Sequence, residues 1–205
     1  MARSTLPDMI GCDIILENYP RKSMTIEVGH IAKDFSCNAV SEKGTIIEGF
    51  NLHEAIENQY GLLFFYPLDF TFVCPTEMIA LHKRMPLLSK MGVKVMTVSV
   101  DSEFSHLRWR ETPVQQGGIG PVDYTMLADV SHQICRDYGV EHAQNHVAYR
   151  ASVIIDKQKV VRAKHINDLP VGRNIDEIVR TIQAVQYHEK HGEVCQAGWQ
   201  EGRAG

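Results

Sequence analysis

The chain has 205 residues, of which 44% are hydrophobic and 22% charged. This length fits one domain with a sizeable core, and this composition is typical of a globular protein. The formal net charge of −4 argues against nucleic acid or an acidic membrane as the main partner. No apolar run approaches the roughly 18 residues that a membrane-spanning helix needs, and acidic residues interrupt any secretory signal near the N-terminus.

The chain contains five cysteines and no C-x-x-C pair. An odd number without paired spacing argues against a disulfide scaffold and against a zinc module. A reducing compartment with one or two functional thiols fits better, so we expect a cytoplasmic protein. We interpret Cys12 as incidental and Cys37 and Cys135 as packing residues, which leaves Cys74 and Cys195 as candidates for chemistry.

The N-terminal part of the chain is weakly patterned. Residues 1–24 predict a loose arm, to which we assign no function. Two β-rich segments follow, residues 37–40 and 45–50, and a Glu-Lys-Gly turn between them indicates a hairpin. Residues 51–57 predict a short helix.

A central strand and helix follow. Residues 62–66 are apolar and aromatic, which is typical of a buried strand, and Pro67 should end it because proline cannot donate to a sheet ladder. Pro75 suits a first helical position, so Cys74 is expected at the N-cap of a helix that runs to about Met91. The free N–H groups at a helix start stabilise a thiolate. On position alone, an activated sulfur and an ordinary buried cysteine are equally good interpretations.

Further alternation of strands and helices follows. Residues 92–100 predict a strand, and Asp-Ser-Glu at 101–103 predicts the start of a helix that ends near Pro113. This order implies parallel strands with right-handed crossovers. Residues 116–121 are a glycine-rich loop without the Lys-Ser/Thr of a phosphate loop, and residues 126–129 predict a short strand.

The C-terminal half adds a strand pair and two helices. Residues 130–138 predict a helix that ends at Gly139. Residues 149–156 and 160–166 predict strands, and the second alternates apolar and polar residues as an edge strand does. Residues 174–187 predict an amphipathic helix.

A possible metal site in this half is weak. His142 and His146 have a spacing that could bind a metal on a helix, but no third ligand is evident. We therefore expect no metal ion and no cofactor.

One motif favours an activated sulfur over an ordinary buried cysteine at position 74. Pro67, Thr71 and Cys74 spell P-x-x-x-T-x-x-C within residues 66–77. This stretch resembles the peroxidatic motif of the typical 2-Cys peroxiredoxins, the AhpC/TSA family that includes the alkyl hydroperoxide reductase C subunits. The resemblance covers roughly residues 25–199. It implies an α/β, thioredoxin-like fold with a central mixed β-sheet flanked by helices.

The resemblance also extends to two later segments. Tyr-Arg-Ala-Ser-Val-Ile-Ile-Asp at residues 149–156 is similar to the family strand that carries the active-site arginine, here Arg150; alone, such an arginine would be a surface strand terminus. Residues 192–199 resemble the resolving-cysteine segment around Cys195, with Gln196 where the family has proline. Arg173 would either support the active-site charge or form a surface ion pair.

The resemblance implies a reaction. A Cys74 thiolate, assisted by Thr71 and Arg150 and shielded by Pro67, would reduce hydrogen peroxide and organic hydroperoxides and become a sulfenic acid. Cys195 of a second subunit would then form an intersubunit disulfide. Thioredoxin or an AhpF- or AhpD-like reductant would reopen it. The expected roles are antioxidant defence and redox homeostasis, in a homodimer that assembles into a ring of dimers.

The expected organisation has three parts: an arm at residues 1–24, a thioredoxin-like peroxiredoxin domain at 25–187, and a tail at 188–205 with the resolving cysteine. Lys33 stands where the family usually has proline, which should change only local backbone stiffness. The family's further C-terminal helix with a Tyr-Phe pair does not follow Cys195. If the tail is complete, we expect resistance to over-oxidation.

Two other functions compete with this interpretation. A thiol–disulfide exchange protein would share a cysteine at a helix start, but such proteins normally use C-x-x-C, and residues 75–77 offer no second thiol. A ring-forming chaperone that shields apolar surface would need no reactive thiol and could coexist with a peroxidase.

Overall fold

The computed structural model describes residues 25–202. The predicted arm and Cys12 lie outside the described residues. Within residues 25–202, no helix is both long enough and apolar enough to cross a lipid bilayer.

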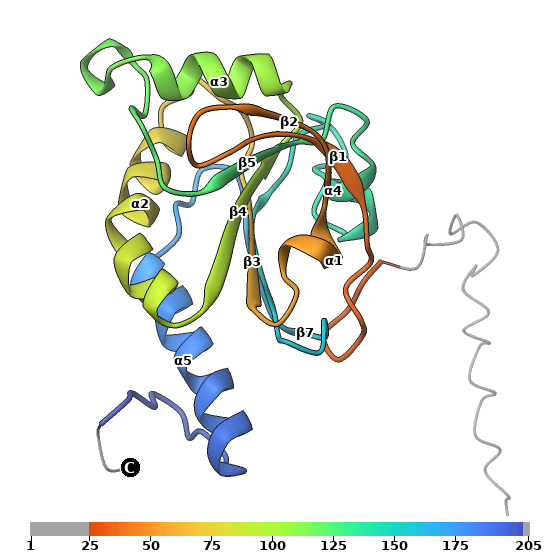
Figure 1. The fold of residues 1–205 in the computed structure, drawn as a ribbon, viewed down its shortest axis with the longest axis vertical. Coiled ribbons are helices and arrows are strands. Elements are labelled where there is room, and N and C mark those ends of the chain that lie inside the picture. The colour runs from red at the N-terminus through yellow and green to blue at the C-terminus, as the bar shows by residue number, and fades with distance from the viewer. Residues whose placement is uncertain (1–24, 203–205) are drawn as a thin grey trace, which may run out of the picture.

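A single seven-stranded sheet forms the centre of the molecule (Figure 1), with the strand order β2-β1-β5-β4-β3-β6-β7. β3 pairs in parallel with β4 and β4 in parallel with β5, whereas the other neighbours are antiparallel. The predicted parallel pairing of these strands and the predicted edge position of the last strand, β7, are therefore confirmed. The strands are β1 Ser36–Val40, β2 Ile46–Asn51, β3 Tyr60–Phe65, β4 Val93–Ser99, β5 Thr125–Ala128, β6 Arg150–Ile155 and β7 Val161–Asn167.

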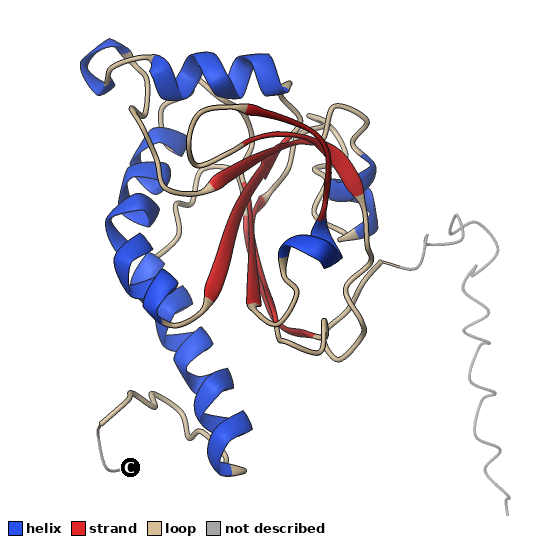
Figure 2. Cartoon of the chain, in the orientation of Figure 1, coloured by secondary structure: helices blue, strands red, loops and turns tan. Residues whose placement is uncertain are grey.

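Helices lie on both sides of the sheet (Figure 2). One face packs against α2 and α5 and the indole of α3, and the other packs against α1 and α4. The predicted mixed sheet flanked by helices is confirmed. The helices are α1 Leu52–Ala55, α2 Cys74–Lys90, α3 Glu103–Glu111, the 3₁₀ turn η1 Val114–Gln116, α4 Gln133–Asp137 and α5 Ile175–His191.

β3 is an interior strand between β4 and β6, and all six of its residues are buried. Leu62 and Phe64 join the core on the α2 and α5 side, while Leu63 and Phe65 join the core on the α1 and α4 side. A strand buried on both faces needs apolar residues at every position, which explains the unbroken apolar run in the sequence. The end of this rigid strand positions the loop that leads to α2.

The helix predicted for residues 130–138 is shorter than expected. His132 adopts a left-handed conformation, φ 60°, which excludes the preceding residues from the helix. The carboxylate of Asp129 accepts hydrogen bonds from the backbone N–H groups of Ile134 and Cys135 at 3.1 and 2.8 Å. This side-chain cap fixes the start of α4, and an apolar-periodicity argument could not locate it.

The last helix is longer than predicted. α5 continues to His191 and ends at Gly192, which takes the left-handed conformation, φ 71°, that glycine adopts without strain. The hydroxyl of Tyr60 at the start of β3 donates to the carboxylate of Glu189, which ties the final turn of α5 to the sheet. The tail predicted from residue 188 therefore begins inside the last turn of this helix.

Candidate active site

Cys74 lies where the loop that follows β3 meets α2. It is the first residue of the helix, one position later than the predicted N-cap, and Val73 occupies that position instead. The difference arises because Val73 already has helical dihedral angles and its carbonyl accepts from the N–H groups of Thr76 and Glu77. Cys74 still lies in the first turn, where the N–H groups of a helix have no intrahelical acceptor, and its side chain is fully buried.

Arg150 is the first residue of β6, the strand beside β3, and it is 4% exposed. Its Nη1 lies 3.5 Å from Sγ of Cys74 and donates to Oε2 of Glu77 at 2.9 Å. Its Nε donates to the carbonyl of Leu169 at 2.6 Å. The guanidinium is thus held on two sides and faces the sulfur, and the alternative of a surface strand terminus is wrong.

Glu77 links this guanidinium to a second one. Its Oε1 accepts from the backbone N–H and Nε of Arg173 at 2.8 and 2.9 Å, and its Oε2 accepts from Nη2 at 3.0 Å. Arg173 is only 3% exposed and lies over the ring of Phe64, 3.3 Å from its centroid. The alternative of a surface ion pair for Arg173 is therefore wrong.

Glu77 was not among the predicted site residues, although its position relative to Cys74 carries one signal. Glu77 follows Cys74 by three residues, and residues with that spacing lie on the same face of a helix. A carboxylate on the buried face of an amphipathic helix needs a cationic partner. The two arginines supply it, so α2 contributes both the thiol and the carboxylate that orients Arg150.

The charges of Glu77, Arg150 and Arg173 determine whether a thiol or a thiolate at Cys74 is favoured. Burial raises the pKa of Glu77, but the hydrogen bonds and charge of Arg173 and the charge of Arg150 outweigh burial, and the pKa is lowered from 4.5. Two guanidiniums and one ionised carboxylate leave one buried positive charge. A thiolate at Cys74 would bring this buried group to neutrality, whereas a thiol would leave a positive charge without a counterion.

The two other predicted residues of this site lie in the connection before α2. Pro67 is buried and follows β3 by two residues. Thr71 is half-buried, and its hydroxyl donates to the carbonyl of Leu68 at 3.0 Å. The hydroxyl of Thr71 is oriented by the backbone of its own loop, three residues before Cys74.

Within one chain, the fold does not place Cys195 next to Cys74. Its Sγ lies 3.5 Å from the carbonyl oxygen of Ala184 on α5, and the side chain is half-buried. The tail turns back after α5 and lies beside this helix in the lower part of the picture, whereas α2 begins in the upper part (Figure 1). The two predicted reactive sulfurs therefore occupy separate regions of one chain.

Side chains of α5 hold this tail in place. Nη1 of Arg180 donates to the carbonyl of Trp199 at 3.1 Å, and the rings of Tyr187 and Trp199 lie 5.0 Å apart. The hydroxyl of Tyr187 donates to Oε2 of Glu193 at 2.6 Å. We call residues 193–201, which fold back along α5, the docked tail.

The other described cysteines lack an activating environment. Cys135 is fully buried, and burial together with the charge of Asp129 raises its pKa. Burial and the same carboxylate raise the pKa of Cys37 to about 12. The packing roles predicted for both residues agree with their places in and beside the α1 and α4 core.

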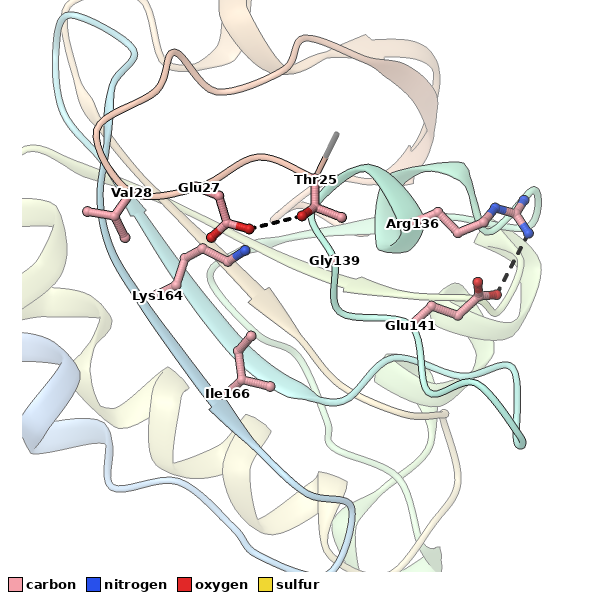
Figure 3. A pocket seen from close by; sticks show the side chains of 8 residues that line it. All are labelled: Thr25, Glu27, Val28, Arg136, Gly139, Glu141, Lys164 and Ile166. Carbon is pink, nitrogen blue, oxygen red and sulfur yellow. Dashed lines mark hydrogen bonds and ion pairs between the residues drawn. The ribbon is translucent and has the colours of Figure 1, made fainter. Parts of the chain in front are cut away.

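No cluster of three or more His, Cys, Asp or Glu side chains that could hold a metal ion occurs among the residues that the structure describes. His142 and His146 flank a turn at residues 143–145 and lie outside any helix, so the helical spacing considered for a metal pair does not apply. An open surface pocket of about 550 Å³ lies between the N-terminal segment, α4 and β7, and its lining contains no cysteine (Figure 3). The buried cluster around Cys74 therefore remains the candidate site.

Comparisons with known proteins agree with this geometry. The AhpC/TSA family model matches residues 28–164, and the model for the C-terminal domain of 1-Cys peroxiredoxin matches residues 184–205. Alkyl hydroperoxide reductase C of Buchnera aphidicola subsp. Baizongia pistaciae is 46% identical over 178 residues, which cover 87% of this chain and 89% of that protein. Peroxiredoxin-2 of Macaca fascicularis is 49% identical over 175 residues, which cover 85% and 87%.

Solved structures give the same result. The reduced 2-Cys peroxiredoxin of Plasmodium vivax superposes with a TM-score of 0.83 at 44% identity, covering 86% of this chain and 91% of that one. AhpC of Enterococcus faecalis superposes with a TM-score of 0.76 at 34% identity, covering 84% of this chain and 100% of that one. The predicted thioredoxin-like fold is confirmed, and the chain belongs to the AhpC/TSA family of peroxiredoxins.

Proposed function

We propose that this chain is a thiol-dependent peroxidase that reduces hydrogen peroxide and organic hydroperoxides, with Cys74 as its nucleophile. The observation that carries the assignment is the 3.5 Å contact between Sγ of Cys74 and Nη1 of Arg150. This contact lies in a buried cluster whose charge a thiolate balances. Membership of the peroxiredoxin family supports the same reaction.

The first step is a displacement on oxygen. The Cys74 thiolate attacks one oxygen of R–O–O–H, an S–O bond forms, and the O–O bond breaks. Sulfur becomes a sulfenic acid, and the other oxygen leaves as an alkoxide or hydroxide that takes up a proton. The permanently charged Arg150 stabilises the thiolate and the developing negative oxygen, and the hydroxyl of Thr71 can hydrogen-bond the peroxide. Pro67 closes one wall and limits access of water to the sulfenic acid.

The second step regenerates the thiol. The thiol of Cys195 from a second subunit displaces the hydroxyl of the sulfenic acid, giving an intersubunit disulfide and water. Because disulfide-bonded residues have Cα atoms within about 7 Å, the docked tail must leave α5 and the first turn of α2 must unwind. A dithiol donor, thioredoxin or an AhpF- or AhpD-like reductant, then reduces the disulfide by exchange.

The proposed assembly is a homodimer that forms a ring of dimers. β7 is an edge strand whose outer backbone groups can pair with a second copy beyond the contacts at its first residues. A reducing, cytoplasmic location fits the four free thiols within residues 25–202. We therefore propose that the peroxidase acts as a dimer paired through β7 in a reducing compartment.

Peroxide consumption, assayed in parallel with thioredoxin and with a flavoprotein donor, tests the proposal. Cys74→Ser should abolish consumption with either donor, because it removes the sulfur that the buried guanidinium of Arg150 contacts at 3.5 Å. Cys195→Ser should allow one turnover and then stop unless an external thiol resolves the sulfenic acid. Cys37→Ser is the matched control and should retain full activity. Sustained consumption by Cys74→Ser would refute the assignment.

A further inference from the structure

The loop of residues 67–73 carries Thr71 and leads to Cys74, and it is anchored by a group of buried polar side chains outside the Cys74 cluster. The centre of that group is Asp69, whose side chain is 1% exposed, and its ionic partner is His106 of α3, which is 0% exposed. Buried charges are retained where a partner and further hydrogen bonds satisfy them. This pair therefore connects the loop to α3 through the interior of the protein.

Every oxygen of the Asp69 carboxylate has a donor. Nδ1 of His106 lies 2.8 Å from Oδ2, and the hydroxyl of Ser105 donates to the same oxygen at 2.9 Å. The hydroxyl of Tyr66 donates to Oδ1 at 2.7 Å. The backbone N–H of Asp69 donates to Oδ2 of Asp101 at 2.9 Å. Asp69 is thus held by its side chain and by its backbone at the same time.

Both ring nitrogens of His106 face acceptors. Nδ1 faces the carboxylate of Asp69, and Nε2 lies 3.1 Å from the carbonyl oxygen of Leu127 on β5. A neutral imidazole donates from only one nitrogen, so this arrangement assigns the doubly protonated, charged ring. Burial lowers the pKa of His106, but the hydrogen bond and charge of Asp69 outweigh burial, and the pKa is raised.

The residue after Asp69 is conformationally strained. Phe70 has φ 52°, a left-handed conformation that bulky side chains rarely adopt and that surrounding structure must enforce. Its ring packs against Trp109 of α3, with the centroids 6.1 Å apart. Contacts to α3 therefore hold the loop at both Asp69 and Phe70, immediately before Thr71.

We propose that Asp69 and His106 are positioning residues of the peroxidase site: their buried ion pair fixes the strained loop to α3 and so aligns Thr71 with the thiol of Cys74. This inference rests on the proposed function, because it concerns the geometry of the same reaction. Neither residue contacts the sulfur. Their effect passes through the loop backbone, two residues before Thr71 and five before Cys74.

The experiment compares two reactions of one sulfur, in the full chain carrying Cys195→Ser. The first reaction is sulfenic acid formation at Cys74 with hydrogen peroxide, and the second is alkylation of Cys74 by iodoacetamide at the same pH, both followed by mass spectrometry of the Cys74 peptide. Alkylation needs the thiolate but does not need the hydroxyl of Thr71. In Asp69→Asn and in His106→Asn, the rate with peroxide should fall about tenfold or more, and the rate of alkylation should fall much less.

Arg110→Met is the matched control for a general loss of stability. Arg110 is a buried residue of the same helix, and its guanidinium donates to the carbonyls of Ser41, Glu42 and Val122, away from the loop. This variant should lower stability without changing the ratio of the two rates. If Asp69→Asn does not fold, Ser105→Ala replaces it as the test variant. This change removes one hydrogen bond to Asp69 and should lower the ratio of the peroxide rate to the alkylation rate to a smaller extent.

An unchanged ratio in Asp69→Asn or Ser105→Ala would overturn the inference while leaving the peroxidase intact. An equal fall in the ratio for Arg110→Met would overturn it as well, since the effect would then be one of stability. A parent chain that forms no sulfenic acid with peroxide would refute the proposed function itself, and the positioning role with it.

Discussion

The two sulfurs proposed to react, Cys74 and Cys195, are held in opposite ways. Cys74 is fully buried, and its partners come from α2, from β6 and from the segment before α5. Cys195 is half-buried and rests on a helix that ends only four residues earlier in the chain. The first environment depends on the whole fold and carries buried charge, whereas the second depends on local surface contacts. A nucleophile needs fixed electrostatics, and a thiol that must travel to a partner needs contacts that can be released.

Removing the guanidinium should produce the largest effect. In Arg150→Met, we expect the second-order rate of Cys74 with peroxide to fall by about 10²–10³, the usual cost of deleting one preorganised charge at a reacting oxygen. Stopped-flow measurement of a single turnover gives this rate. Arg84→Met is the matched control, because Arg84 forms an exposed ion pair with Asp176 and is expected to leave the rate unchanged. Equal losses in the two variants would contradict the role of Arg150.

Glu77→Gln should have the next largest effect, on stability and its pH dependence. The carboxylate has a lowered pKa in the folded protein, so its stabilising contribution is present at neutral pH and is lost as the pH falls through the folded value. Breaking a buried ion pair costs about 3–5 kcal/mol, and we expect a loss toward the lower end at pH 7 because glutamine still accepts hydrogen bonds from Arg173.

Urea unfolding from pH 7 down to pH 3 measures this difference. The parent chain and Glu77→Gln should converge in stability as the pH falls below about 4.5, the ordinary value for glutamate. Glu177→Gln provides the control, since this exposed glutamate pairs with Arg180 at the surface and its removal should cost less than about 1 kcal/mol. A constant difference between the parent and Glu77→Gln at all pH values would show that charge is not involved.

A smaller effect should appear at Cys195. In Tyr187→Ala, loss of the ring contact with Trp199 and of the hydrogen bond to Glu193 should release the docked tail. These contacts are worth about 0.5–1.5 kcal/mol each, so the reaction of Cys195 with a disulfide reagent should become several-fold faster in a Cys74→Ser background. Gln186→Ala is the control, because Gln186 lies on the same helix but donates to the carbonyl of Met91. Equal rates in Tyr187→Ala and the parent would mean that the docked tail does not limit access.

Sequence patterns located most of the fold because their signals were local. The apolar run before Pro67 predicted β3, and the proline after Cys74 predicted the start of α2 to within one residue. The start of α4 was missed because it is set by two hydrogen bonds that the Asp129 carboxylate accepts from the N–H groups of Ile134 and Cys135, which apolar periodicity does not register. The extension of α5 was missed because its last turn is polar and is held by a contact between Glu189 and β3.

The site was predicted in part for the same reason. Cys74 and Arg150 could be proposed from motifs, and the structure brings them together. The partners of Arg173 and the anchoring of the loop through Asp69 and His106 join residues 37 to 96 positions apart, and no spacing rule connects them. The docked tail was also missed, because it is held by Arg180 and Tyr187, which a sequence pattern places on the solvent-facing side of α5.

The rate at which iodoacetamide alkylates Cys74 at pH 7 tests the central claim most directly, that the guanidinium of Arg150 stabilises the thiolate form of this sulfur. We expect alkylation in the parent chain to be about tenfold or more faster than in Arg150→Met, whereas Arg84→Met should match the parent. A rate that Arg150→Met leaves unchanged, or that Arg84→Met lowers equally, would contradict the account.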